Sequence, residues 1–141
     1  MHEIRTIGQR EALFAIDAIT TEVEARGKAA VIAVADAYGE IIAMLRMDGA
    51  SLTSGIIAQK KAFTAAREGK SSKAIGERIR DPERGHDVAY FGDDRYIGWG
   101  GGIPVIVNGA CCGAVAISGL PEAEDIEICE GVVDRLVSTF S

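Results

Sequence analysis

The chain has 141 residues, 48% hydrophobic and 26% charged, the size and composition of a single soluble domain spanning 1–141 rather than of a two-domain enzyme. Acidic residues outnumber basic ones 21 to 15, and the net charge of −6 disfavours general binding to nucleic acid or to anionic membranes. Two histidines cannot build a three-histidine zinc site within one subunit. The N-terminal segment lacks the features of a secretory signal, so we expect a cytoplasmic protein.

The first elements are predicted to be a helix and a β-hairpin. Apolar residues recur at helical spacing over 9–26, and Gly27 supplies a stop signal. Two short apolar runs follow, at 29–36 and 41–45, with Gly39 between them. This pattern predicts a hairpin in which both strands are well buried.

The middle of the chain is predicted to contain two helices and a long loop. Ser51 or Thr53 is suited to cap a helix that runs to about Glu68, and a shorter helix is expected over 71–80, before Asp81-Pro82. Residues 81–102 are rich in glycine, aromatic and charged residues without a clear period. Such a stretch is typical of a functional or ordered loop.

The last third is predicted to form a second hairpin and a terminal helix. Asn108-Gly109 lies between two β-rich runs within 103–118, which is a strong hairpin signal. Pro121 and the acids after it suit the start of a helix with one apolar face that reaches Phe140. The order α-β-β-α-α-β-β-α indicates an α+β fold, an antiparallel sheet of four or five strands with the terminal helices covering one face.

The glycine run in GWGGG (98–102) is a candidate pocket wall. It precedes a strand, whereas a phosphate-binding loop follows a strand and opens a helix. Glycines without side chains allow a backbone or a ligand to approach closely. We therefore expect Gly100, Gly101 and Gly102 to contribute to a ligand site, with a sharp bend into the next strand as the structural alternative.

The corner Arg46-Met47-Asp48-Gly49 lies between a predicted strand and a helix N-terminus, where anions are favoured. Arg46 could bind a ligand carboxylate, and Asp48 could serve as an acid-base group. The alternative is that Asp48 pairs with Arg46 or caps the helix. Asp36, at the end of the preceding strand, is a further candidate for ligand binding.

Lys60 and Lys61 lie side by side in a mostly apolar helix. Adjacent helical positions point about 100° apart, so at most one of the two faces solvent squarely. The other must extend to solvent, pair with an acid or meet an anion, and partial burial would permit general-base or Schiff-base chemistry. Pairing with Asp36 or Asp48 is the favoured interpretation.

Charge is distributed unevenly along the chain. Residues 60–84 carry eight bases and four acids, whereas residues 122–141 carry six acids and one base. This asymmetry suggests an anionic small ligand or a contact between subunits. His86, in the glycine-rich loop, is the one internal imidazole available for proton transfer or metal ligation, unless it is simply exposed.

Four segments together resemble the GlcG/HbpS-like family, which includes the C-terminal domain of PduO-type corrinoid adenosyltransferases. They are AVIAVADAYGEIIAMLRMDGA (30–50), IIAQKKAFTAA (56–66), GWGGGIPVIVNGACCGAVAISG (98–119) and PEAEDIEICEG (121–131). The resemblance implies a profilin/PAS-like fold, a homo-oligomer and, as in some relatives, haem binding. Some relatives ligate haem through a histidine of the first helix. Helix 9–26 has none, so either His86 would have to take that place or haem would bind without a strong protein ligand.

Three functions are compatible with these features. The first is a ligand-binding protein that holds haem or another anionic planar molecule between the Arg46–Asp48 corner and the glycine run. The second is an enzyme without a redox cofactor, acting on a small carboxylate or aromatic catabolite through Asp48, Lys60 or Lys61, and His86. The third is an accessory module that serves only assembly. The first two require that the corner and the glycine run share one cavity.

Overall fold

A computed structural model describes residues 1–141 and confirms the predicted order of elements. The elements are α1 (Gln9–Ala25), β1 (Val31–Asp36), β2 (Ile41–Arg46), α2 (Leu52–Glu68), α3 (Ser72–Ile79), the 3₁₀ turn η1 (Val88–Phe91), β3 (Gly102–Val107), β4 (Ala110–Ser118) and α4 (Glu122–Phe140).

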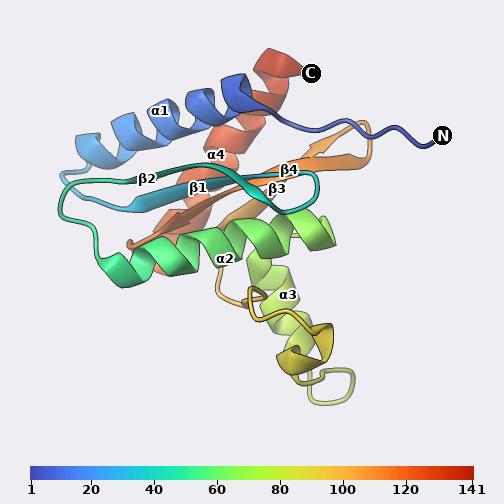
Figure 1. Cartoon of the computed structure of the whole chain (residues 1–141). Coiled ribbons are helices and arrows are strands. Elements are labelled where there is room, and N and C mark those ends of the chain that lie inside the picture. The colour runs from blue at the N-terminus through green and yellow to red at the C-terminus, as the bar shows by residue number, and fades with distance from the viewer.

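The four strands form one antiparallel sheet in the order β2-β1-β4-β3. α1 and α4 pack on one face and α2 on the other, whereas α3 and η1 project beyond the sheet (Figure 1). The prediction that the terminal helices share a face is therefore confirmed. β1 and β4 lie in the centre of the sheet, covered on both faces, which explains why their sequences are almost continuously apolar.

The turn between β3 and β4 follows the Asn-Gly prediction. Asn108 and Gly109 have φ of 51° and 79°, the left-handed values that a two-residue hairpin turn requires. β3 is an edge strand and contains Pro104, which has no N–H to donate to a neighbouring strand. The turn fixes where β4 begins, at Ala110; β4 ends at Ser118, after which the chain turns into α4.

The prediction that both strands of the first hairpin are well buried is wrong for β2. β1 is buried along its length, but β2 is the other edge of the sheet and most of its residues are exposed. Ile42, Met44 and Leu45 remain accessible to solvent. An apolar run can mark an edge strand as well as a central one, because hydrophobicity alone does not say how many neighbours a strand has.

α2 lies close to the sheet because its inner face is made of small residues. Alanines of α2 pack on Val31 of β1 and on alanines of β1 and β4, and together they form a buried cluster. The Ser51 side chain accepts a hydrogen bond from the Ser54 N–H, so the helix begins with the predicted cap. The close approach of α2 to the sheet brings the Lys61 side chain against the end of β4.

α3 is held to the loop that precedes β3 by contact between two glycine backbones. A Cβ built on Gly76 would lie 2.0 Å from the Gly98 carbonyl oxygen, and one built on Gly98 would lie 2.6 Å from the Gly76 Cα. No side chain fits between these segments. The contact fixes the start of the glycine run, which forms one wall of the cavity described next.

Candidate functional site

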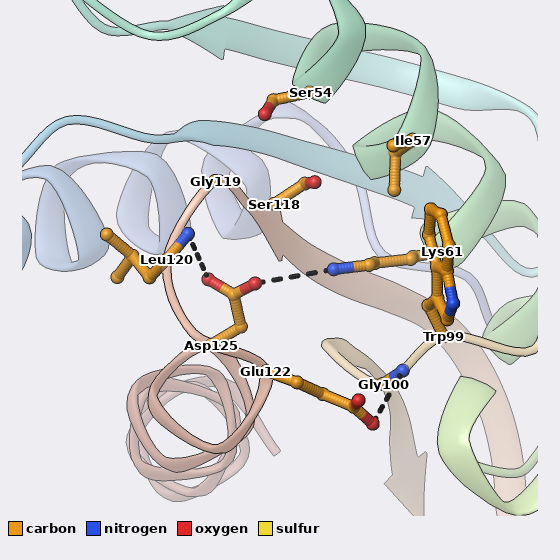
Figure 2. A pocket seen from close by; sticks show the side chains of 10 residues that line it. All are labelled: Ser54, Ile57, Lys61, Trp99, Gly100, Ser118, Gly119, Leu120, Glu122 and Asp125. Carbon is orange, nitrogen blue, oxygen red and sulfur yellow. Dashed lines mark hydrogen bonds and ion pairs between the residues drawn. The ribbon is translucent and has the colours of Figure 1, made fainter.

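A cavity of about 350 Å³ lies where four segments meet: α2, the end of β4, the first turn of α4 and the glycine run. Figure 2 shows the side chains that line it. The ten lining residues are Ser54, Ile57, Lys61, Trp99, Gly100, Ser118, Gly119, Leu120, Glu122 and Asp125. Only three of them are hydrophobic, so this is a polar cavity.

Lys61 is the only basic residue in the lining. Its side chain is 5% exposed, and its Nζ donates a hydrogen bond of 2.9 Å to the carbonyl oxygen of Ile117. A second, longer contact of 3.4 Å joins Nζ to Oδ2 of Asp125 (Figure 2). Burial disfavours the charged ammonium and lowers the pKa of Lys61, although the Asp125 carboxylate partly offsets this effect.

Asp125 approaches the same amine from α4. Its side chain is 2% exposed, and its Oδ1 accepts a hydrogen bond of 3.3 Å from the Leu120 N–H. Burial raises the pKa of Asp125 to about 6, against the opposing effects of Lys61 and the Leu120 hydrogen bond. The cavity therefore joins an amine with a lowered pKa to a carboxyl group with a raised pKa.

The mouth of the cavity carries an acid, an aromatic ring and a hydroxyl group. Glu122 accepts a hydrogen bond of 3.1 Å from the Gly100 N–H. Trp99, the single tryptophan of the chain, is half-exposed and lines the same cavity as Lys61 (Figure 2). Ser118, a buried residue at the end of β4, contributes its hydroxyl group to the cavity lining.

The glycine run is explained by close packing behind this cavity. Gly101 has φ of +127°, and a Cβ there would lie 2.6 Å from the Ile117 carbonyl oxygen and 2.8 Å from the Lys61 Nζ. A Cβ on Gly100 would meet Glu122 at 2.5 Å, and one on Gly102 would meet the Lys61 carbonyl oxygen at 2.4 Å. Side chains at these positions would displace the groups that form the site.

The structure separates the residues that the sequence analysis grouped into one site. Lys61 and Gly100 line the cavity, and Gly101 and Gly102 are buried directly behind it. Arg46 and Asp48 are exposed at the end of β2 and do not line it. Within one chain, the Arg46–Asp48 corner and the glycine run therefore do not share a cavity.

The remaining candidates lie elsewhere. Asp36 accepts hydrogen bonds from the N–H groups of Tyr38 and Glu40, so it stabilises the β1–β2 turn. Lys60 lines a different pocket, between α2 and the β1–β2 turn, together with Arg95. The predicted pairing of a buried lysine with Asp36 or Asp48 is also wrong, because the partner is Asp125.

His86 is half-buried in the loop beyond α3, outside the Lys61 cavity. Its ring contacts the Phe91 ring, with the centroids 5.1 Å apart, and its Nδ1 lies 3.0 Å from the Asp87 carbonyl oxygen. The structure contains no group of three or more His, Cys, Asp or Glu side chains arranged to hold a metal ion. None of its helices is long and apolar enough to cross a membrane.

Four cavity residues, Asp125, Glu122, Ser118 and Trp99, were not predicted from the sequence. The acids of the first turn of α4 fit the role of partners of the helix dipole. Asp125, however, falls on the buried stripe that continues through Ile128, Cys129 and Val132. An acid on the apolar face of a helix is the signal that could have singled out Asp125.

The arrangement supports two kinds of chemistry. A buried amine beside a buried carboxyl group can exchange a proton with a bound ligand. A buried lysine can also act as a nucleophile when its amine is neutral. The fold and this site define an α+β protein with a polar cavity of the size that accommodates a small molecule.

Residues 7–134 match the family described as "Haem degrading protein HbpS-like", and the chain belongs to this family. It is 32% identical to protein GlcG of Escherichia coli K12 over 112 residues, which cover 79% of this chain and 81% of GlcG. The crystal structure of Klebsiella pneumoniae protein ORFY superposes with a TM-score of 0.88 at 25% identity, covering 100% of this chain and 97% of ORFY. The PduOC:heme complex shares the fold, with a TM-score of 0.83 at 20% identity over 92% of this chain and 94% of PduOC.

Haem does not fit the Lys61 cavity. No histidine, cysteine, methionine or tyrosine side chain lines it, and its polar walls lack the broad apolar faces that a porphyrin ring requires. None of the five principal cavities of the molecule contains a histidine. His86 remains the one imidazole in the folded body of the chain, on a different surface.

Proposed function

We propose that this protein binds a small polar molecule in the Lys61 cavity. The observation that carries the proposal is the Lys61 amine, which is withdrawn from solvent but lines a cavity together with Asp125. Removing an amine and a carboxylate from water is costly, and a contact of 3.4 Å returns only part of that cost. Ionisable groups held in a cleft with perturbed pKa values are typical of ligand-binding and catalytic sites.

The charges of the cavity favour a ligand with carbonyl, hydroxyl or amide groups. Lys61 is its only base, whereas Glu122 and Asp125 are acids. A ligand with several carboxylates would meet both of these acids at close range. The sequence-based expectation of an anionic ligand depends on residues 60–84, most of whose bases lie outside the cavity.

The fluorescence of Trp99 provides a direct test, because this single tryptophan lies at the mouth of the cavity. Short-chain aldehydes, ketones, alcohols, amides and carboxylates would be titrated into the protein in turn. We expect a saturable change in emission with carbonyl, hydroxyl or amide compounds. Loss of the hydrogen bond from Lys61 should weaken this binding by on the order of tenfold or more in Lys61→Met.

Two further variants keep this test interpretable. Lys60→Met alters the neighbouring lysine, which lines another pocket, and should bind like the wild type. Lys61→Met with Asp125→Leu replaces both members of the buried pair by apolar side chains, so it should fold without leaving a buried charge unpaired. If this double variant binds as tightly as the wild type, or if no compound changes the emission of Trp99, the proposal is wrong.

The family match favours haem as a second candidate ligand. Since the Lys61 cavity does not fit haem, binding would involve His86 on its separate surface. Titration with haemin should then shift the Soret absorption in the wild type and in Lys61→Met, but not in His86→Ala. An unchanged haemin spectrum with the wild-type protein would remove this candidate.

A further inference from the structure

We propose that Lys61 is a nucleophile that forms an imine with an aldehyde or ketone group of the molecule bound in the cavity. This inference rests on the proposed function and adds a class of ligand and a chemical step. It depends on the position of the Lys61 amine, on the two acceptors that hold it and on the carboxyl group beside it.

The surroundings of the amine suit a neutral nucleophile. A neutral lysine amine has two N–H bonds and one lone pair. The structure supplies one acceptor for each N–H, the Ile117 carbonyl oxygen at 2.9 Å and Asp125 Oδ2 at 3.4 Å. The lone pair is then left for a ligand in the cavity. Burial acts in the same direction, because it lowers the pKa of Lys61 and increases the share of neutral amine.

Asp125 supplies the proton that the reaction needs. Attack of the Lys61 nitrogen on the carbonyl carbon forms a C–N bond, and the carbonyl π electrons move to oxygen. The nitrogen loses a proton and the oxygen gains one, which gives a carbinolamine. A second proton, from the Asp125 carboxylic acid, allows this oxygen to leave as water, so the products are the protonated imine, the Asp125 carboxylate and one water molecule.

The other four lysines of the chain lack this environment. Lys28 is exposed and pairs with Glu124 at 2.7 Å. Lys60 lines the separate pocket beside Arg95, and Lys70 and Lys73 are exposed. None of them lines the cavity, so the proposal predicts a reaction at one position out of five.

Reductive trapping tests this prediction. The full chain would be incubated near neutral pH with glycolaldehyde, acetone or pyruvaldehyde and sodium cyanoborohydride, which reduces an imine to a stable secondary amine. Peptide mapping by mass spectrometry then locates the added mass. We expect modification at Lys61 to be faster than at any other lysine and to be lost in Lys61→Met.

One variant tests the role of Asp125 as a proton donor, and a second serves as a control at the neighbouring lysine. Asp125→Asn keeps the size of the side chain but removes the acidic proton, so trapping should slow by on the order of a hundredfold and lose its dependence on pH near 6. Lys60→Met should leave trapping at Lys61 unchanged, since Lys60 lies in another pocket. Circular dichroism of each variant verifies that it is folded.

The outcomes distinguish this inference from the proposed function. If a carbonyl compound changes the emission of Trp99 but is not trapped on Lys61, the imine is wrong and ligand binding stands. If trapping is spread evenly over the lysines, the imine at Lys61 is also wrong. If trapping at Lys61 is equally fast in Asp125→Asn, Asp125 is not the proton donor. If no carbonyl compound binds while an alcohol or amide does, the carbonyl ligand is excluded and the cavity remains a binding site.

Discussion

At the scale of single residues, the site depends on two groups whose ionisation is altered by burial. Asp125 and Lys61 are 64 residues apart in sequence, in α4 and α2, and meet at the end of β4. Burial favours the neutral form of both groups, whereas the charge of each partner opposes this effect. When one of the two becomes neutral, the other therefore loses the interaction that favoured its charged form. The stability of the protein should therefore depend on pH through Asp125.

We predict that the free energy of unfolding falls as pH rises from about 4 to about 6, the interval between the ordinary pKa of an aspartate and that of folded Asp125. In this interval the folded protein retains a proton that the unfolded chain has released. At about 1.4 kcal/mol for each unit of pKa, the decrease due to Asp125 is about 3 kcal/mol. Urea unfolding at a series of pH values should show a flatter profile for Asp125→Asn.

Glu124, the neighbouring acid, provides a control of opposite sign. Hydrogen bonds from Lys28 and Arg26 lower the pKa of Glu124, so its ionisation stabilises the folded protein, and this contribution is lost as pH falls. In Glu124→Gln, the free energy of unfolding should therefore lose the part of its increase with pH that the ionisation of Glu124 contributes. Parallel profiles for the wild type and Asp125→Asn would contradict the altered ionisation of Asp125.

The sequence alone could predict only part of this site. The helix containing Lys60 and Lys61 was predicted from its periodicity, but their neighbours in sequence do not say which lysine faces inward. That choice depends on the register of α2 against β4, where alanines of both elements meet. Asp125 as the partner could not be predicted by distance along the chain, because the contact depends on how β4 turns into α4.

At the scale of elements, the glycine run shows how a local backbone shape depends on distant segments. Each α-helix and strand of the fold was predicted close to its observed bounds because periodicity and turn residues are local signals. The exposure of β2 was not predicted, because it depends on the order of strands in the sheet. The requirement for glycine at Gly101 also depends on distant segments, because α2, β4 and α4 together leave no room for a side chain there.

We predict that Gly101→Ala destabilises the protein severely. Its φ of +127° alone should cost about 1–3 kcal/mol, and the Cβ would lie 2.6 Å from the Ile117 carbonyl oxygen. Gly131, within α4, is the matched control: a Cβ there meets nothing within 4 Å, so Gly131→Ala should stabilise the helix by about 0.5–1 kcal/mol. Urea unfolding measures both, and a mild effect of Gly101→Ala would show that the loop can move away.

At the scale of the whole molecule, one edge of the sheet remains apolar and uncovered. Ile42 and Met44 of β2 and Leu52 and Ile56 of α2 are exposed. Exposed apolar residues beside an unpaired strand are typical of contacts between chains. The homo-oligomer inferred from charge asymmetry and family resemblance stays a prediction, and these residues give it a location.

We predict that the protein self-associates through this edge. Size-exclusion chromatography with light scattering should give a mass larger than that of one chain, and Met44→Glu with Ile56→Glu should shift the mass toward the monomer. Leu13→Glu, which changes an exposed leucine of α1, should leave the mass unchanged. A monomeric wild-type protein would refute this prediction.

The contact between Gly76 and Gly98 has a mechanical consequence. Because backbone rests directly on backbone, α3 cannot rotate or slide without displacing the peptide next to Trp99. Force applied to α3, by a bound protein or by a change in the loop around η1, would thus be transmitted to the entrance of the cavity without passing through the sheet. If the cavity binds the proposed small molecule, α3 would influence the rates of its entry and release without contacting it.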